Sequence, residues 1–216
     1  MIKAVIFDMD GVLVAAKDWH YEALNRALAL FSFEISREKH LTQYDGLPTY
    51  KKLEMLSEEE GLPKALHDLI NEKKQSYTMD IIHEKCVPNA VHKHALFTLK
   101  ARGYKLALAS NSTRHSVDLI MHKTQLDIYL DELFSASDVL RPKPHPEIYN
   151  KAISTLKLSP DECLILEDNI NGVKAARDSG AHLLIINEVS DVNLENIMAR
   201  IQQIESIGYH HEAHYA

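Results

Sequence analysis

The 216-residue sequence is poor in the features that mark several classes of protein. It has only two cysteines, Cys86 and Cys163, which are far apart and belong to no metal-binding or redox motif, so we expect no disulfide framework. No uncharged apolar stretch approaches the roughly 20 residues that a membrane-spanning helix needs. The start of the chain lacks the basic and apolar regions of a signal peptide. We therefore expect a cytoplasmic protein with reduced thiols and no membrane partner.

Positive charge is also scarce. The chain has 24 lysines and arginines against 31 aspartates and glutamates, so its net charge is −7. Nucleic-acid binding usually needs a basic patch or a basic excess, and we expect no nucleic-acid partner. What the sequence does have is apolar residues, at 45% of the total, which is enough for a buried core. The oligomeric state is left open.

Four short apolar runs have the character of strands that are covered on both faces of a sheet. They are residues 3–7, 104–110, 163–167 and 182–186. Helical segments, several with helix-start or helix-stop residues, lie between the later runs, at 91–103, 112–124, 145–158 and 170–181. This alternation of strands and helices predicts an α/β fold with crossover connections and a parallel sheet.

The stretch between the first two runs is different, because it has helical segments and no convincing strand. Helical spacing of apolar residues is found at 19–31, 49–61 and 62–82. We predict a helical cap domain at 15–87, inserted into a core made of 1–14 and 88–216. Two thin connections, near 14–17 and 86–89, would permit hinge motion between the two parts.

Polar residues stand where three of the predicted strands end. In chain order they are Asp8, Asp10, Ser110, Asn111, Glu167 and Asp168. Side chains two residues apart in an extended chain point the same way, and the carboxyl ends of parallel strands form the edge where ligands bind. Each group alone also has a simpler explanation as a polar strand end or a helix N-cap. Lys143, between two prolines, could be an ordinary surface lysine.

Together, these groups favour phosphoryl transfer at a magnesium site. Clustered carboxylates would repel one another without a cation, and hard oxygen ligands favour Mg²⁺. The helix N-terminus that follows Ser110 and the ammonium of Lys143 would complete a phosphate pocket. One aspartate can attack phosphorus to form an aspartyl-phosphate, while its neighbour exchanges protons with the leaving oxygen and with water.

The segments DMDGVLV, ASNS, RPKPHPEIY and LILEDNINGVKAARDSGA resemble, in this order, the four motifs of the haloacid dehalogenase superfamily. The likeness is nearest to the β-phosphoglucomutase and sugar-phosphatase branch and covers essentially the whole chain. It implies a Rossmann-like core with a helical cap. It also implies that Asp8 is the nucleophile and Asp10 the acid/base, and that the phosphoryl group is bound by Ser110, Asn111 and Lys143.

The resemblance implies a metal site as well, formed by Asp8, the backbone carbonyl of Asp10 and Asp168, with Glu167 in or beside the shell. In the cap it implies that His20 and Lys73 lie near the acid/base aspartate. These metal and cap residues are carried over from the family's motifs alone. Lys74 is a competing choice for the cap lysine.

Two departures from the family's pattern affect the cap. Ala15 and Ala16 stand where the family usually has an acidic residue followed by Ser or Thr, which removes hydrogen bonds that position the hinge. Thr49 stands near the place of the arginine that grips the distal phosphate in the mutase, with Lys51 and Lys52 just beyond. A lysine can supply a point charge there, but not a bidentate fork.

The leading expectation is a Mg²⁺-dependent phosphatase of a small phosphorylated metabolite, with sugar phosphates as the favoured class. A phosphohexomutase that uses the same aspartyl-phosphate is the alternative. A binding protein without catalysis is disfavoured by the presence of both Asp8 and Asp10, and a dehalogenase by the acidic pair at 167–168, since it needs no metal site. The histidine-rich end, YHHEAHYA, is interpreted as a solvated tail.

Overall fold

The core of the protein is a five-stranded parallel sheet. The computed structural model describes residues 1–212 of the chain. Its strands are β1 (Ala4–Phe7), β2 (Lys105–Ala109), β3 (Glu132–Phe134), β4 (Cys163–Glu167) and β5 (His182–Ile185). They lie in the order β3-β2-β1-β4-β5, with every neighbouring pair parallel. The predicted α/β fold is therefore confirmed, and β1 is the central strand.

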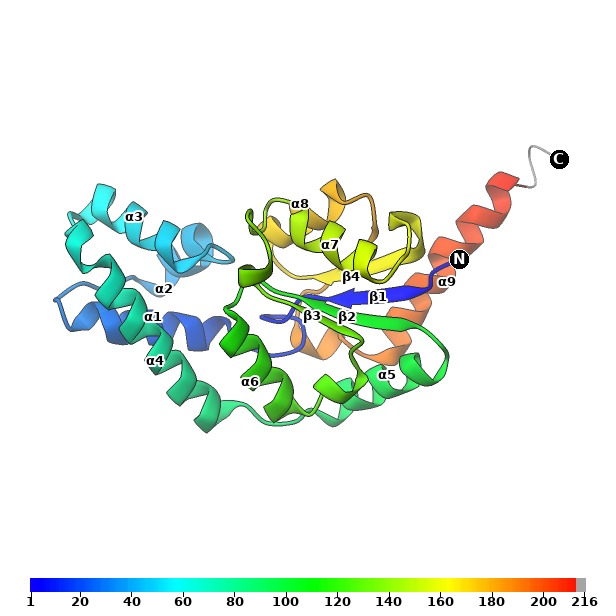
Figure 1. The fold of residues 1–216 in the computed structure, drawn as a ribbon, viewed down its shortest axis with the longest axis horizontal. Helices are drawn as coiled ribbons and strands as arrows, with labels where there is room; N and C mark the ends of the chain where they lie inside the picture. Colours follow the sequence, from blue (N-terminus) through cyan, green and yellow to red (C-terminus); the bar gives the residue numbers. More distant parts are fainter. Residues whose placement is uncertain (213–216) are drawn as a thin grey trace.

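Helices cover both faces of the sheet (Figure 1). One face carries α5 (Ala90–Ala101), α6 (Arg114–Thr124) and α9 (Leu194–Glu212), and the other carries α7 (Glu147–Thr155) and α8 (Ile170–Asp178). Successive side chains of a strand point to opposite faces, so Val5 and Phe7 of β1 pack into the first layer and Ala4 and Ile6 into the second. This burial on both sides explains why the strands are continuous apolar runs.

A helical cap follows β1 and lies beyond the carboxyl end of that strand (Figure 1). Its helices are α1 (Lys17–Ala29), α2 (Arg37–Lys39), α3 (Thr49–Glu60) and α4 (His67–Lys85). The cap has a hydrophobic core of its own, in which Leu28 of α1, Leu53 and Leu56 of α3 and Ile70 of α4 are buried. The inserted helical cap is thus confirmed, whereas the boundaries 1–14, 15–87 and 88–216 stay a prediction.

The two connections between core and cap are short. They differ in the N-cap of the helix that follows each one. Ala16 is the N-cap of α1 and offers no side-chain acceptor, which costs about 1 kcal/mol relative to a serine or threonine. Asn89 is the N-cap of α5, and its side chain accepts from the N–H groups of Val91 and His92. The helix after the first connection therefore lacks the side-chain cap that the helix after the second one has.

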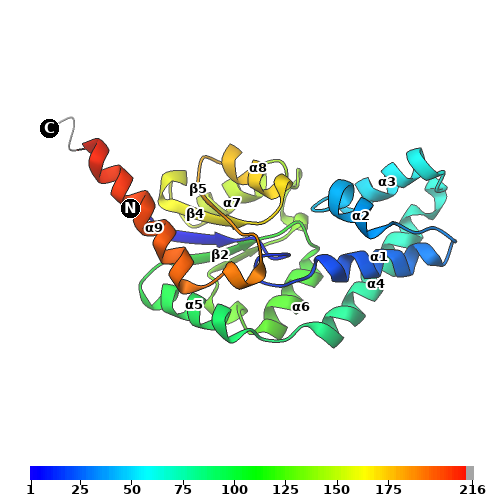
Figure 2. The ribbon, with the colours of Figure 1, turned by 180° about the vertical axis from the view of Figure 1, so that it is seen from behind.

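Two elements of the fold, β3 and α9, could not be read from the sequence. β3 has only three residues, two of them half-buried, and so lacks an apolar run. The long helix α9 projects from the body of the core (Figure 2) and includes residues 209–212, so the start of the predicted tail is helical. The rest of that tail, 213–216, lies outside the described residues. Within residues 1–212, no helix is both long and apolar enough to span a bilayer.

Candidate active site

Asp8 leaves β1 at the centre of the sheet edge. Phe7 pairs with Leu166 of β4, so the next residues, Asp8 and Glu167, emerge side by side. The side chain of Lys143 lies between these two carboxylates, with its Nζ 2.6 Å from Asp8 Oδ1 and 2.6 Å from Glu167 Oε1. The same ammonium donates to the carbonyl oxygen of Ala109 at 2.7 Å. Lys143 is 3% exposed, so it is a buried part of the site and not a surface lysine.

Glu167 is fully engaged in hydrogen bonds. The Tyr149 hydroxyl donates to its Oε1 at 2.5 Å, and the backbone N–H of Asp168 donates to its Oε2 at 3.1 Å. The Tyr149 ring also lies under the Lys143 ammonium, 4.7 Å from ring centre to Nζ. Tyr149 was not predicted as a site residue. In the sequence it occupies an apolar position of a helical segment, as an aromatic residue of the core would.

Asp10 contacts both the core and the cap. Ser112 Oγ donates to Asp10 Oδ2 at 2.6 Å, and His20 Nε2 of α1 lies 3.2 Å from the same oxygen. On its other side, His20 Nδ1 lies 3.4 Å from the Nζ of Lys74. The predicted proximity of Asp10 and His20 is therefore found, and a cap lysine completes a chain of three polar groups.

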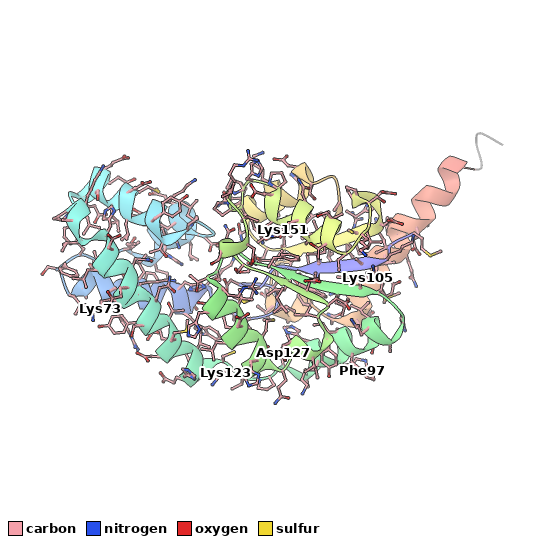
Figure 3. The ribbon with its side chains drawn as sticks, in the orientation of Figure 1. Lys73, Phe97, Lys105, Lys123, Asp127 and Lys151 are labelled. Carbon is pink, nitrogen blue, oxygen red and sulfur yellow. The ribbon has the colours of Figure 1, made fainter. Side chains whose placement is uncertain are left out.

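That cap lysine is Lys74, and the prediction of Lys73 is corrected. Lys74 is 8% exposed and lines the cavity in front of Asp10. Lys73, which Figure 3 labels on α4, is more exposed and does not line that cavity. Neighbouring residues of an α-helix point about 100° apart, and α4 is rotated so that Lys74, and not Lys73, faces the site.

Ser110 and Asn111 follow β2 and bring a third strand to the site. Ser110 is 1% exposed, and its Oγ accepts from the backbone N–H of Ser112 at 3.0 Å. Asn111 holds the loop of Lys143 through both ends of its amide, since Oδ1 accepts from Lys143 N at 3.0 Å and Nδ2 donates to Lys143 O at 3.1 Å. Asn111 thus positions the main chain that carries the lysine.

Three carboxylates form a cluster that suits a metal ion. Asp8, Glu167 and Asp168 each offer one oxygen, and these oxygens lie within 4.8 Å of one another. Gly11 has φ +97° and passes so close that a Cβ there would lie 1.8 Å from Asp168 Oδ2. An oxygen-only donor set of this kind fits Mg²⁺. The ammonium of Lys17, a residue that sequence reasoning missed, lies 2.7 Å from Asp168 Oδ2.

Asp8 and Asp10, at the end of β1, lie in environments that shift their pKa values in opposite directions. Burial and the negative charge of Glu167 raise the pKa of Asp8 well above its usual value, against the effect of Lys143. Burial acts on Asp10 in the same direction, but His20 and Ser112 outweigh it and hold the pKa of Asp10 below its usual value. This divergence is the reverse of what the expected roles need, since a nucleophile must be ionised and an acid must be protonated. The negative charge of a bound phosphate would raise the pKa of Asp10. A divalent cation beside Asp8 would favour its ionised form.

A cavity of about 410 Å³ separates the core from the cap. This volume is within the range of small-molecule sites. Core residues on its wall are Asp8, Asp10, Ser110, Asn111 and Lys143, and cap residues are His20, His40, Thr49, Lys52 and Lys74. All of the predicted phosphate-binding side chains therefore face one cavity, together with Thr49 from the start of α3.

Comparison with known proteins gives the family from the sequence and a shared fold from the structure. The family model "Haloacid dehalogenase-like hydrolase" matches residues 5–186. A phosphorylated carbohydrates phosphatase of Thermotoga maritima is 28% identical over 88% of this chain and 88% of its own. Protein CbbY of Rhodobacter capsulatus is 30% identical over 85% of each. The crystal structure of β-phosphoglucomutase from Clostridium difficile superposes with a TM-score of 0.81 at 20% identity, covering 94% of this chain and 98% of that one.

Proposed function

The chain belongs to the haloacid dehalogenase-like hydrolases, and on this basis we propose that it is a Mg²⁺-dependent phosphatase of small phosphorylated metabolites, with sugar phosphates as the favoured class. One observation carries the proposal: Asp8 and Asp10 border the same cavity as Ser110 and Lys143. A nucleophile, an acid/base and two phosphate-binding groups are thereby available to one ligand. The name of the Thermotoga maritima relative, a phosphatase of phosphorylated carbohydrates, supports the substrate class.

In the first step, a carboxylate oxygen of Asp8 attacks phosphorus and the bond from phosphorus to the ester oxygen breaks. Asp10 in its acid form gives its proton to that leaving oxygen, so the product leaves as an alcohol. Lys143 and Ser110 hold the phosphoryl oxygens during the transfer. The contacts of Lys143 with Asp8 and Glu167 support this role, because they keep its ammonium at the reacting carboxylate.

In the second step, Asp10 accepts a proton from water as the water oxygen attacks the phosphorus of the aspartyl-phosphate. The bond between phosphorus and Asp8 breaks, which releases inorganic phosphate and regenerates both carboxyl groups in their starting forms. His20 and Lys74 orient Asp10 for both proton transfers from the cap side, a role that their contacts support.

A divalent cation would be held by Asp8 and Asp168, together with the backbone carbonyl of Asp10. Bound there, it supplies charge stabilisation to the transferring phosphoryl group. Glu167 supports this site through Lys143, because both of its oxygens already accept hydrogen bonds from other groups. The three clustered carboxylates are what supports a metal at this place.

Hydrolysis is favoured over the mutase alternative by two features of the cap. A mutase must exclude water and hold a bisphosphate intermediate by both ends, and Thr49 offers no charged fork for the second phosphate. The α1 N-cap, Ala16, provides no side-chain hydrogen bond to hold the first connection in a closed form. The first feature weakens the hold on a bisphosphate, and the second favours an open cap that admits water to an aspartyl-phosphate.

We expect the enzyme to release inorganic phosphate from β-glucose 1-phosphate or smaller sugar phosphates without a bisphosphate activator. The measurement follows phosphate and glucose 6-phosphate together, with and without catalytic amounts of glucose 1,6-bisphosphate. A hydrolase can form no more glucose 6-phosphate than the bisphosphate supplied. Formation of glucose 6-phosphate far beyond that amount, with little phosphate release, would contradict the hydrolase assignment and establish the mutase.

A further inference from the structure

Lys17, the first residue of α1, lies between a carboxylate of the core and a carboxylate of the cap. Its Nζ is 2.7 Å from Asp168 Oδ2 and 3.3 Å from Oδ2 of Asp45, which follows the helical turn His40–Tyr44. A Cβ on Gly11 would lie 2.8 Å from Lys17 Cε, so the glycine leaves room for the lysine beside Asp168. No step of the proposed mechanism uses this ammonium.

The carboxylate cluster is therefore accompanied by two positive charges of the protein itself. Lys143 lies between Asp8 and Glu167, and Lys17 pairs with Asp168, the third member of the cluster. The side chain of Asp168 is only 2% exposed, and a buried carboxylate without a positive neighbour is costly. Lys17 thus serves as the counter-ion of Asp168.

The two lysines differ in how firmly they are held. Lys143 is buried and has a third contact, with the carbonyl oxygen of Ala109. The side chain of Lys17 is 33% exposed. Within the described residues, Asp168 Oδ2 accepts no hydrogen bond of regular geometry, so its contact with Lys17 is an ion pair without a directional bond. Lys17 is consequently the lysine that can leave the cluster.

A divalent cation and the ammonium of Lys17 would compete for Asp168. Two positive charges at one carboxylate repel each other, and Mg²⁺ needs close, nearly octahedral contact with its oxygen ligands. Asp45 is already within ion-pair distance of Lys17 on the cap side. The ammonium can therefore give up Asp168 and still keep a negative partner.

The segment of the cap that contains Asp45 lies against the core at two further points. Asn171 Nδ2 donates to the carbonyl oxygen of Asp45 at 3.3 Å, and Asn111 Nδ2 donates to that of Gly46 at 3.4 Å. The ion pair of Lys17 with Asp168 is thus one of several contacts between cap and core at this edge. A change at Asp168 is in this way connected to the position of α1.

We propose that Lys17 is a displaceable counter-ion of Asp168, which a divalent cation drives toward Asp45, so that metal binding loosens one contact between core and cap. This inference rests on the proposed metal site and adds a residue that sets its affinity. Because coupling between two binding events is reciprocal, a movement of α1 that draws Lys17 away from Asp168 should also tighten metal binding.

The test measures the Kd of Mg²⁺ by isothermal titration calorimetry, without substrate. Lys17→Met removes the competing charge and should lower this Kd about 5- to 150-fold, the usual range of coupling between two sites. Lys17→Gln, which is uncharged but polar, should do the same and serves if the methionine variant folds poorly. Lys17→Arg keeps the charge and should leave the Kd near that of the unmodified protein.

Lys85→Met is the matched control. Lys85 is another ion-paired lysine of the cap, with Nζ 2.7 Å from Glu22 Oε2, and it does not border the cavity. Its replacement removes the same charge from the same part of the protein, and it should leave the Kd of Mg²⁺ unchanged.

A double-mutant cycle tests the role of Asp45. Asp45→Asn removes the second partner of Lys17, so the ammonium should hold Asp168 more strongly and Mg²⁺ should bind about 5-fold more weakly or less tightly still. In a protein that already carries Lys17→Met, the same replacement should have little effect. An equal effect in both backgrounds would overturn the displacement toward Asp45.

The other outcomes separate this inference from the function beneath it. Absence of Mg²⁺ binding to all of these proteins would overturn the metal dependence of the proposed function, and the counter-ion with it. Equal or weaker binding by Lys17→Met and Lys17→Gln, relative to the unmodified protein, would overturn the competition alone. Tighter binding by Lys17→Arg, to the same extent as by Lys17→Met, would also overturn it, because the positive charge would then not be the cause.

Discussion

Replacing Asp8 with asparagine should lower turnover by on the order of 10⁶-fold, the scale on which enzymes lose activity when their nucleophile is removed. An amide has the shape of the carboxylate but cannot form the aspartyl-phosphate. Its oxygen can still accept from Lys143, which also keeps its contact with Glu167. Since burial already disfavours the ionised form of Asp8, we expect the variant to fold and to unfold at nearly the same temperature.

The measurement is steady-state phosphate release, combined with acid quenching to trap the labelled phosphoenzyme. Asp80→Asn is the matched control, because Asp80 is an exposed carboxylate on α4 and borders no part of the cavity. It should retain full turnover and the trapped intermediate. Near-normal activity in Asp8→Asn, or label trapped on a different residue, would show that the mechanism is wrong.

Removing divalent metal should have the second-largest effect, a loss on the order of 10³-fold or more, since a bound ion supplies several kcal/mol of transition-state stabilisation. The loss should reverse with Mg²⁺ and only poorly with Ca²⁺, whose looser coordination disturbs the in-line geometry. Asp168→Asn should reproduce the loss, because Asp168 is in the carboxylate cluster and the amide has no negative charge to hold a cation.

Binding can be measured without catalysis. Mg²⁺ should raise the unfolding temperature of the unmodified protein, because an ion that binds only the folded state stabilises it by about 2.7 kcal/mol at 100 times its Kd. The same ion should have little effect on Asp168→Asn. Full turnover in excess chelator, or an equal rise in unfolding temperature for both proteins, would count against a metal at this cluster.

Residues at the carboxyl end of a strand, or directly after it, were the ones that the sequence placed well. Asp8, Ser110 and Glu167 each come immediately after a buried apolar run, and the parallel pairing of β2, β1 and β4 brings them to one edge. The strand boundary fixes where such a residue lies, so a local pattern is enough to predict a tertiary site. The cap inserted after the first strand could be predicted for a similar reason, from the long interval without a strand.

Residues whose role depends on the rotation or packing of a helix could not be placed in this way. The choice between Lys73 and Lys74 depends on the phase of α4 against α1, which sequence spacing does not determine. Tyr149 and Lys52 have apolar or surface-like contexts in the sequence, and only packing shows that one contacts Glu167 and the other borders the cavity. β3 was missed because its three residues depend on pairing with β2 more than on their own composition.

The central position of β1 also determines when the site can be assembled. β1 is the first strand to be synthesised, but its neighbours begin at Lys105 and Cys163. The cap lies between β1 and β2 in the chain and can bury Leu28, Leu53 and Ile70 without any strand. We expect pulse-labelled hydrogen exchange during refolding to protect α1 and α4 before β1, and simultaneous protection of all three would contradict this order. Asp8 meets Glu167 and Asp168 only after β4 has paired, so a partly made chain holds neither the carboxylate cluster nor the chemistry that depends on it.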